Sequence, residues 1–152
     1  MARDEFFMHR ALDQARLALA EGEVPIGAVV VNAEGVIIGA GYNAPRRDHD
    51  PTAHAEIQAL RAASAECGNY RLQGCTVYVT LEPCMMCLGA MIHARIERVV
   101  YGAREPRTGM LASVANLADQ PWFNHRVNHQ GGVLATPCKR LLTEFFKTRR
   151  AE

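Results

Sequence analysis

The sequence predicts a single α/β domain, and two patterns support this fold class. Short apolar runs typical of buried strands alternate with longer stretches in which apolar residues recur at helical spacing. Between residues 76 and 101 the order is strand, helix, strand, which implies a right-handed parallel crossover. A chain of 152 residues is long enough to build one ordinary core, so we expect one domain over residues 1–152.

Helices and strands follow one another along the chain, separated by short polar or glycine-containing turns. In chain order we expect a helix over 4–21, strands over 26–31 and 36–42, a helix over 52–65, a strand over 76–81, a helix from Pro83 to about residue 94, strands over 98–101 and 126–130, and a helix from Thr136 to about residue 149. Residues 109–118 are predicted to be partly helical. Trp122 and Phe123 are expected to anchor that segment by burial.

Turn and capping residues set these boundaries. Gly22 closes the first helix, and the composition of residues 32–35 is typical of a hairpin turn. Residues 43–50 are expected to form a polar loop, and loops in such a position often carry substrate contacts. Asp50-Pro51 and Thr136-Pro137 have the chemistry of an N-cap followed by the first helical residue.

Composition and charge exclude several classes of protein. The 49% hydrophobic and 22% charged content is that of a soluble globular protein. The sequence contains no run of 18 apolar residues and does not begin with a signal peptide, so we expect a cytoplasmic protein that does not associate with a membrane. Five cysteines without a secreted framework favour free thiols and metal binding over disulfides.

Two cysteines three residues apart, Cys84 and Cys87, follow the strand predicted over residues 76–81. Pro83 marks a helix start, so both thiols fall in the first turn on one helix face, where the helix dipole favours thiolates. A Cys-x-x-Cys pair alone can equally be a redox dithiol or half of a structural zinc site. No fourth Cys or His follows at short spacing, so a zinc site here keeps an open position.

His54 and Glu56 supply the remaining groups of a catalytic zinc site, a nitrogen ligand and a free proton carrier. Residues two apart in a regular helix point about 200° away from each other. Both can therefore serve one site only if they approach it from the end of the helix.

The pattern His54-Ala55-Glu56 with Pro83-Cys84-Met85-Met86-Cys87 resembles the H-x-E…P-C-x-x-C signature of zinc-dependent nucleobase deaminases. Over nearly the whole chain, distinctive segments resemble the bacterial tRNA-specific adenosine deaminases of the cytidine/deoxycytidylate deaminase superfamily: residues 23–29, 50–57, 69–72, 78–84 and 89–93. The resemblance implies a three-layer α/β/α fold around a mixed five-stranded sheet. It also implies one Zn²⁺ per subunit, held by His54, Cys84 and Cys87, with Glu56 as the catalytic proton shuttle.

The resemblance further implies hydrolytic deamination of adenosine to inosine at the wobble position of a tRNA anticodon stem-loop, carried out by a homodimer. The residues expected to contact substrate are Asn43, Ala55, Glu105, Arg107, Phe145, Phe146, Arg149 and Arg150. Members of the family usually have Asp where Glu105 stands, so the side chain here is one methylene longer. The last four belong to a basic C-terminal segment, residues 139–152, with five basic and two acidic side chains, a local charge of +3. A solvated helix end explains the same charges equally well.

Two other functions fit the same motifs. One is a zinc-dependent deaminase of a free base or nucleotide, of the guanine or cytosine type. The other is a non-catalytic, zinc-stabilised RNA-binding subunit, which Glu56 disfavours because a purely structural site has no use for a proton shuttle.

Overall fold

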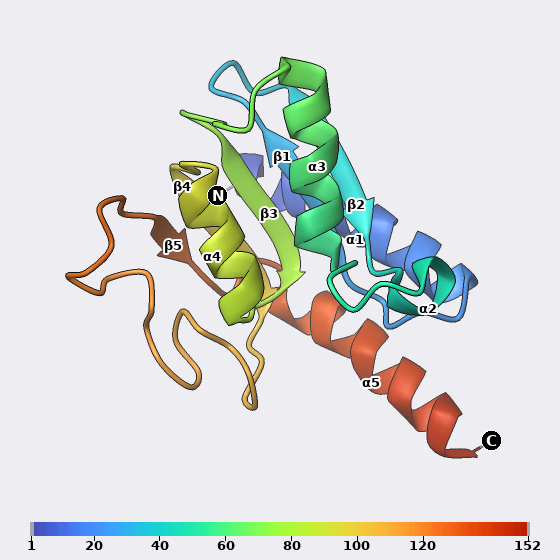
Figure 1. Cartoon of the computed structure of the whole chain (residues 1–152). Coiled ribbons are helices and arrows are strands. Elements are labelled where there is room, and N and C mark those ends of the chain that lie inside the picture. Colours follow the sequence, from blue (N-terminus) through green and yellow to red (C-terminus); the bar gives the residue numbers. More distant parts are fainter. Residues whose placement is uncertain (1, 152) are drawn as a thin grey trace.

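The computed structural model describes residues 2–151, which form a five-stranded mixed sheet with helices on both faces (Figure 1). The elements are α1 (Ala2–Ala20), β1 (Gly27–Val31), β2 (Ile37–Tyr42), α2 (Pro45–Asp48), α3 (Ala55–Cys67), β3 (Thr76–Leu81), α4 (Met85–His93), β4 (Arg98–Ala103), β5 (Asn128–Gln130) and α5 (Ala135–Ala151). Strand order is β2-β1-β3-β4-β5. β1 is antiparallel to β2 and β3, whereas β3, β4 and β5 are parallel. The α/β class and the mixed five-stranded sheet are therefore confirmed.

Two hydrophobic clusters cover opposite faces of the sheet, because alternate residues of a strand point to opposite sides. One cluster joins α3 and α4 to the sheet through residues such as Val30 of β1 and Val77 of β3. The other joins α1 and the start of α5 to Val29 and Tyr78, the neighbours of those residues in the same strands. The result is three layers, with α3 and α4 in front of the sheet and α1 behind it in Figure 1.

Glycines in β2 allow α3 to lie directly on the sheet. A Cβ atom on Gly41 would lie 2.5 Å from the backbone nitrogen of Ala59, and one on Gly39 would lie 2.5 Å from the Ala59 carbonyl oxygen. No real Cβ makes contacts this short, so only glycine permits the approach. The close contact fixes how α3 lies on the sheet, and His54 is the residue that precedes this helix.

Two predicted helix starts were wrong by two or three residues. α3 begins at Ala55 because Asp50 closes a local turn instead, its Oδ1 accepting a hydrogen bond from the Thr52 backbone N–H at 2.8 Å. α4 begins at Met85, with Cys84 as N-cap, so Pro83 precedes the helix. Each N-cap residue has extended backbone angles, which places it outside the regular helix.

The C-terminal third departs further from prediction. Residues 109–118 form turns without a helix, and Trp122 is 69% exposed rather than buried, while Phe123 does pack on the core. The last strand, β5, is shorter than predicted, because it covers Asn128–Gln130 and not residues 126–130. α5 starts at Ala135, one residue before the predicted Thr136 N-cap. This region connects two parallel strands by irregular chain, where hydrophobic periodicity carries little information.

A buried ion pair attaches α1 to the sheet. Asp4, which is 5% exposed, accepts hydrogen bonds from Arg98 Nη2 at 2.7 Å and from the Tyr78 hydroxyl at 2.8 Å. Hydrogen bonding to Arg98 is the largest cause that lowers the pKa of Asp4, and burial raises the pKa of Tyr78 to about 12. Asp4 therefore stays a carboxylate and Tyr78 a neutral donor at physiological pH.

No helix within residues 2–151 combines the length and the apolar character needed to cross a membrane.

Candidate active site

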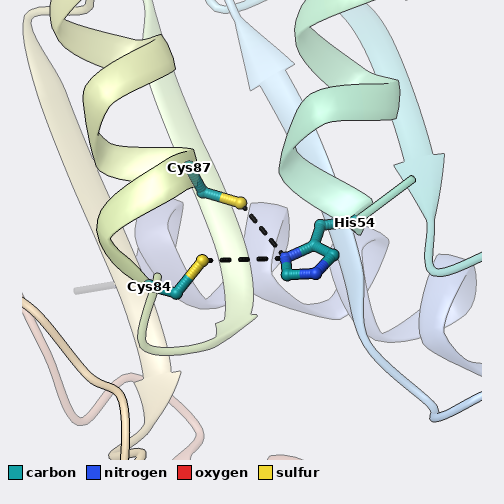
Figure 2. Close-up of side chains that lie close together, drawn as sticks. All are labelled: His54, Cys84 and Cys87. Carbon is teal, nitrogen blue, oxygen red and sulfur yellow. Dashed lines mark hydrogen bonds between the residues drawn. The ribbon is translucent and has the colours of Figure 1, made fainter. Parts of the chain in front are cut away.

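Three potential metal ligands converge where α3 and α4 begin, side by side on one face of the sheet (Figure 2). His54 Nδ1 lies 3.7 Å from Cys84 Sγ and 3.4 Å from Cys87 Sγ. A tetrahedral zinc ion, with bonds of about 2.3 Å to sulfur and 2.0–2.1 Å to nitrogen, would hold the two kinds of ligand atom about 3.6 Å apart. The observed separations fit such an ion.

The helix ends explain how residues distant in sequence meet here. His54 is the N-cap of α3 with φ −75° and ψ 155°, and Cys84 is the N-cap of α4 with φ −80° and ψ 177°. Cys87 lies in the first turn of α4. Because His54 precedes the helix and Glu56 lies inside its first turn, the 200° separation of a regular helix does not apply. Both side chains approach the site from the helix end, as the shared role requires.

The two thiols have opposite acidities. The neighbouring Cys87 thiol is the largest cause that lowers the pKa of Cys84, to about 3, with His54 adding to the effect. The Cys84 group and burial raise the pKa of Cys87. A divalent cation held by both cysteines would bind them as thiolates, and two thiolates with one imidazole form a donor set suited to zinc.

Glu56 is the acid/base candidate of the site. It is 4% exposed, and burial is the largest cause that raises its pKa to about 7, with the negative charge of Cys84 adding to the effect. A carboxyl group with a pKa near 7 can both accept and donate a proton at neutral pH, which is the property general acid/base catalysis needs.

A cavity of about 540 Å³ opens over these residues. His54, Glu56 and Cys84 line it together with residues from four other parts of the chain: Val24, Ile26 and Asn43 near β1 and β2; Leu81 and Glu82 at the end of β3; Ala103, Arg104, Glu105, Pro106, Arg107 and Thr108 at the end of β4 and after it; and Lys139, Leu142, Thr143, Phe146 and Arg150 on α5. Buried acid/base and ligand groups therefore share one cavity with four basic side chains.

Residues 1–103 match the family model described as the cytidine and deoxycytidylate deaminase zinc-binding region. The chain belongs to this deaminase family. The family's zinc-binding character and the donor geometry together identify zinc as the metal that the site suits.

The individual proteins that resemble this deaminase include tRNA adenosine deaminases and a guanine deaminase. The tRNA-specific adenosine deaminase of Haemophilus influenzae is 48% identical over 149 residues, covering 98% of this chain and 86% of the relative. A solved structure from a study of A-to-I editing by tRNA:A34 deaminases at the wobble position of transfer RNA superposes with a TM-score of 0.86 at 42% identity, covering 90% of this chain and 99% of that one. A guanine deaminase from Nitrosomonas europaea gives a TM-score of 0.78 at 26% identity, covering 93% and 83%.

Near His54 and the two cysteines of the deaminase, a hydrogen bond links the two residues predicted to contact substrate, Asn43 and Ala55. Asn43, 7% exposed, lines the cavity, and its Oδ1 accepts a hydrogen bond from the Ala55 backbone N–H at 2.9 Å. It therefore also satisfies a free N–H at the start of α3. The Ala55 side chain is fully buried and is not part of the cavity lining.

The predicted contacts on α5 divide between two sides of the helix. Phe146 and Arg150 line the cavity. Phe145 is buried, and Arg149 places its guanidinium 5.1 Å from the Phe145 ring centroid while its Nη2 donates to the Gly22 carbonyl at 2.6 Å. Residues four apart share a helix face, so the two i,i+4 pairs separate into one that faces the cavity and one that faces the end of α1. Glu105 and Arg107, after β4, both line the cavity.

Sequence reasoning counted Lys139 only within the basic C-terminal segment and assigned no role to Thr143, Arg104 or Glu82. Glu82 is 2% exposed; burial opposes its ionisation, but hydrogen bonds from Ser113, Ala112 and Glu105 outweigh burial and lower its pKa to about 2. The available signal was a single acidic residue between the apolar strand β3 and Pro83, a position where a charge needs several partners.

Proposed function

We propose that the protein converts adenosine to inosine at the wobble position of a tRNA anticodon, using one Zn²⁺ per subunit. The observation that carries the proposal is the buried Glu56 carboxyl beside His54, Cys84 and Cys87, inside a cavity with basic side chains in its lining. The H. influenzae relative and the tRNA:A34 deaminase structure support this substrate over a free base.

His54, Cys84 and Cys87 would hold the zinc, which would make a bound water nucleophilic near neutral pH. Glu56 takes one proton from the attacking water and delivers it to N1 of the adenine, so that C6 is electrophilic enough to form a bond to the water oxygen. Glu56 then takes the second proton from the hydroxyl group now on C6 and gives it to the amino group, the C6–N bond breaks, and the C6 oxygen remains as the carbonyl of inosine. The overall reaction consumes adenosine and water and yields inosine and ammonia.

The cavity provides contacts for the base and for the chain around it. Ile26 offers an apolar surface to a purine, and the Nδ2 group of Asn43 is the donor that this residue can offer, because its Oδ1 is bonded to Ala55. Lys139 and Arg150 of α5 can neutralise phosphates, and Phe146, 42% exposed, can stack on a flanking base. An anticodon loop presents an unpaired base, so moving it into the cavity costs less than extraction from a duplex.

The proposal includes a cytoplasmic homodimer, since tRNA is a cytoplasmic substrate and the family resemblance of the sequence implies a homodimer. The face formed by α3 and α4 supports it: Tyr70, 65% exposed, lines a depression of about 460 Å³ there together with Ile57 and Leu60. Sedimentation velocity at micromolar concentration tests this part, and a purely monomeric boundary would contradict it.

Guanine deamination is the second candidate, because the N. europaea guanine deaminase has the same fold at 26% identity. The zinc ligands and Glu56 would serve either reaction. The basic residues on α5 favour a polynucleotide, since a free neutral base has no phosphate for them to bind.

A substrate panel tests the proposal. Zinc-quantified protein is incubated with a tRNA bearing adenosine at the wobble position and, separately, with adenosine, adenine, guanine and cytosine, and the products are identified by mass spectrometry. Inosine formed only in the tRNA supports the proposal. Xanthine from guanine with the tRNA unchanged would replace it with the second candidate, and no product with zinc bound would favour a non-catalytic subunit.

A further inference from the structure

The carboxylate of Glu82, at the end of β3, accepts hydrogen bonds from several backbone N–H groups of the loop that follows β4. Its Oε1 accepts from the backbone N–H of Glu105 at 3.1 Å, and its Oε2 accepts from three consecutive backbone N–H groups, those of Leu111 at 3.1 Å, Ala112 at 2.8 Å and Ser113 at 3.0 Å. The Ser113 hydroxyl also donates to Oε1. One buried side chain therefore holds both ends of the segment from residue 105 to residue 113.

A second hydrogen bond joins the same segment to the turn that carries Cys84. The backbone N–H of Met110 donates to the Pro83 carbonyl at 3.0 Å. Gly109 passes so close that a Cβ there would lie 2.3 Å from Glu82 Cδ, so the chain can pass only without a side chain. Glu82 and Pro83 directly precede Cys84, and the segment is thereby hydrogen-bonded to the turn that carries this metal ligand.

Residues 104–108, which overlap the start of this segment, form one wall of the active-site cavity. They belong to no helix or strand, so nothing in regular secondary structure fixes their distance from the metal ligands. The hydrogen bonds to Glu82 and Pro83 supply that constraint. A carboxylate buried with this number of donors is fully satisfied, and removing its charge would leave donors without an acceptor.

We propose that Glu82 is a positioning residue that holds the 104–108 wall at a fixed distance from the metal ligands and thereby sets how tightly the deaminase binds its RNA substrate. Glu82 lines the same cavity, but both of its carboxylate oxygens accept hydrogen bonds from the loop, so its role there is to hold that wall. The inference rests on the proposed function for its kinetic readout but not for its structural one.

Glu82→Gln tests this role, because it keeps the shape of the side chain and replaces one acceptor by an NH₂ group that faces N–H donors. We expect hydrogen exchange at the amides of residues 105 and 111–113 to accelerate at least tenfold. The KM for wobble-adenosine tRNA should rise about tenfold while kcat stays within about twofold and zinc content is unchanged, as for a loss of uniform binding. Glu66→Gln, an exposed glutamate on α3, is the matched control and should change neither quantity.

Gly109→Ala perturbs the same contact from the other side, and at a distance in sequence from the metal ligands. Its methyl group would push the loop off the carboxylate, so the same rise in KM and the same faster exchange are expected. Gly89→Ala, where a Cβ would meet nothing within 4 Å, is its control. If Glu82→Gln does not fold, the Gly109→Ala result decides.

An unchanged KM in both variants despite faster exchange would overturn the inference. Loss of zinc with a matching fall in kcat would overturn it too, because Glu82 would then support only the turn that carries Cys84. Unchanged exchange would overturn it as well. If the wild-type protein makes no inosine in tRNA, the proposed function fails, and the exchange experiment still decides whether Glu82 holds the loop.

Discussion

His54 Nδ1 lies 3.4 Å from Cys87 Sγ, although 33 positions separate the two residues in the sequence. Each belongs to the first turn or N-cap of its helix, and the two helices lie on the same face of the sheet, packed on β1 and β3. The sheet thus brings together two helix N-termini, where the helix dipoles favour negatively charged thiolates. The fold itself creates the metal site.

Glu56→Gln should lower the rate of inosine formation by about 10²–10⁴-fold, the range for removal of a general acid/base. Zinc content should stay at the wild-type value, because Glu56 is not among the three ligand residues. Single-turnover kinetics and metal analysis on the same sample measure both quantities. Near-normal turnover in the variant would show that another group carries the protons.

Gly41→Ala should destabilise the protein by roughly 1–3 kcal/mol, since the new methyl group would overlap the backbone of α3 at Ala59. Displacement of α3 also moves His54, so zinc affinity should fall. Chemical denaturation and zinc titration test both effects. Gly89→Ala in α4 is the control and should raise stability by about 0.5–1 kcal/mol, because the added Cβ meets no neighbour and alanine favours helix.

Asp4→Asn should reduce the free energy of unfolding at pH 7 by about 2 kcal/mol, as expected for breaking a partly buried pair with Arg98. The pKa of Asp4 is lowered in the folded state, so its stabilising effect is fully present above the unfolded pKa near 3.8 and is lost as pH falls through the lower folded pKa. Urea unfolding of wild type and variant from pH 7 to pH 2 should therefore converge at the acid end. A difference that persists unchanged at pH 2 would contradict this. Asp13→Asn, in an exposed pair with Arg10, should cost less than about 1 kcal/mol.

Phe146→Ala and Phe145→Ala should have different consequences despite being neighbours. Phe146 lines the cavity, so its loss should weaken tRNA binding by about 1–3 kcal/mol, the contribution of one stacked base, with little change in melting temperature. Phe145 is buried, so its loss should mainly lower the melting temperature. Fluorescence binding to an anticodon stem-loop and thermal unfolding separate the two. If both variants lost the same binding affinity and melted at similar temperatures, the assignment of Phe146 to the cavity and Phe145 to the core would be contradicted.

Sequence patterns predicted the sheet well because strands such as residues 76–81 are short, apolar and bounded by turn formers. They failed where a local hydrogen bond competes with helix formation, as at Asp50, whose side chain closes a turn and leaves His54 as the N-cap. That error concealed the reason why His54 and Glu56 can serve one site.

The site could be predicted in part. His54, Glu56, Cys84 and Cys87 were identified from residue type and spacing together with a family resemblance. The role of Glu82 could not be, because its donors, residues 105 and 111–113, lie 23 to 31 positions away in a segment without periodicity. Nor does composition show how α5 is rotated against the sheet. That rotation decides that Phe146 and Arg150 face the cavity while Phe145 and Arg149 face the end of α1.

The central claim is that this zinc deaminase acts on one adenosine of a tRNA. The most direct measurement is position-resolved mass mapping of ribonuclease fragments after incubation of an adenosine-34 tRNA with wild-type protein and with Glu56→Gln, at equal zinc content. The account predicts inosine at the wobble position alone with wild type and none with the variant. Inosine at other positions, or equal conversion by the variant, would contradict it.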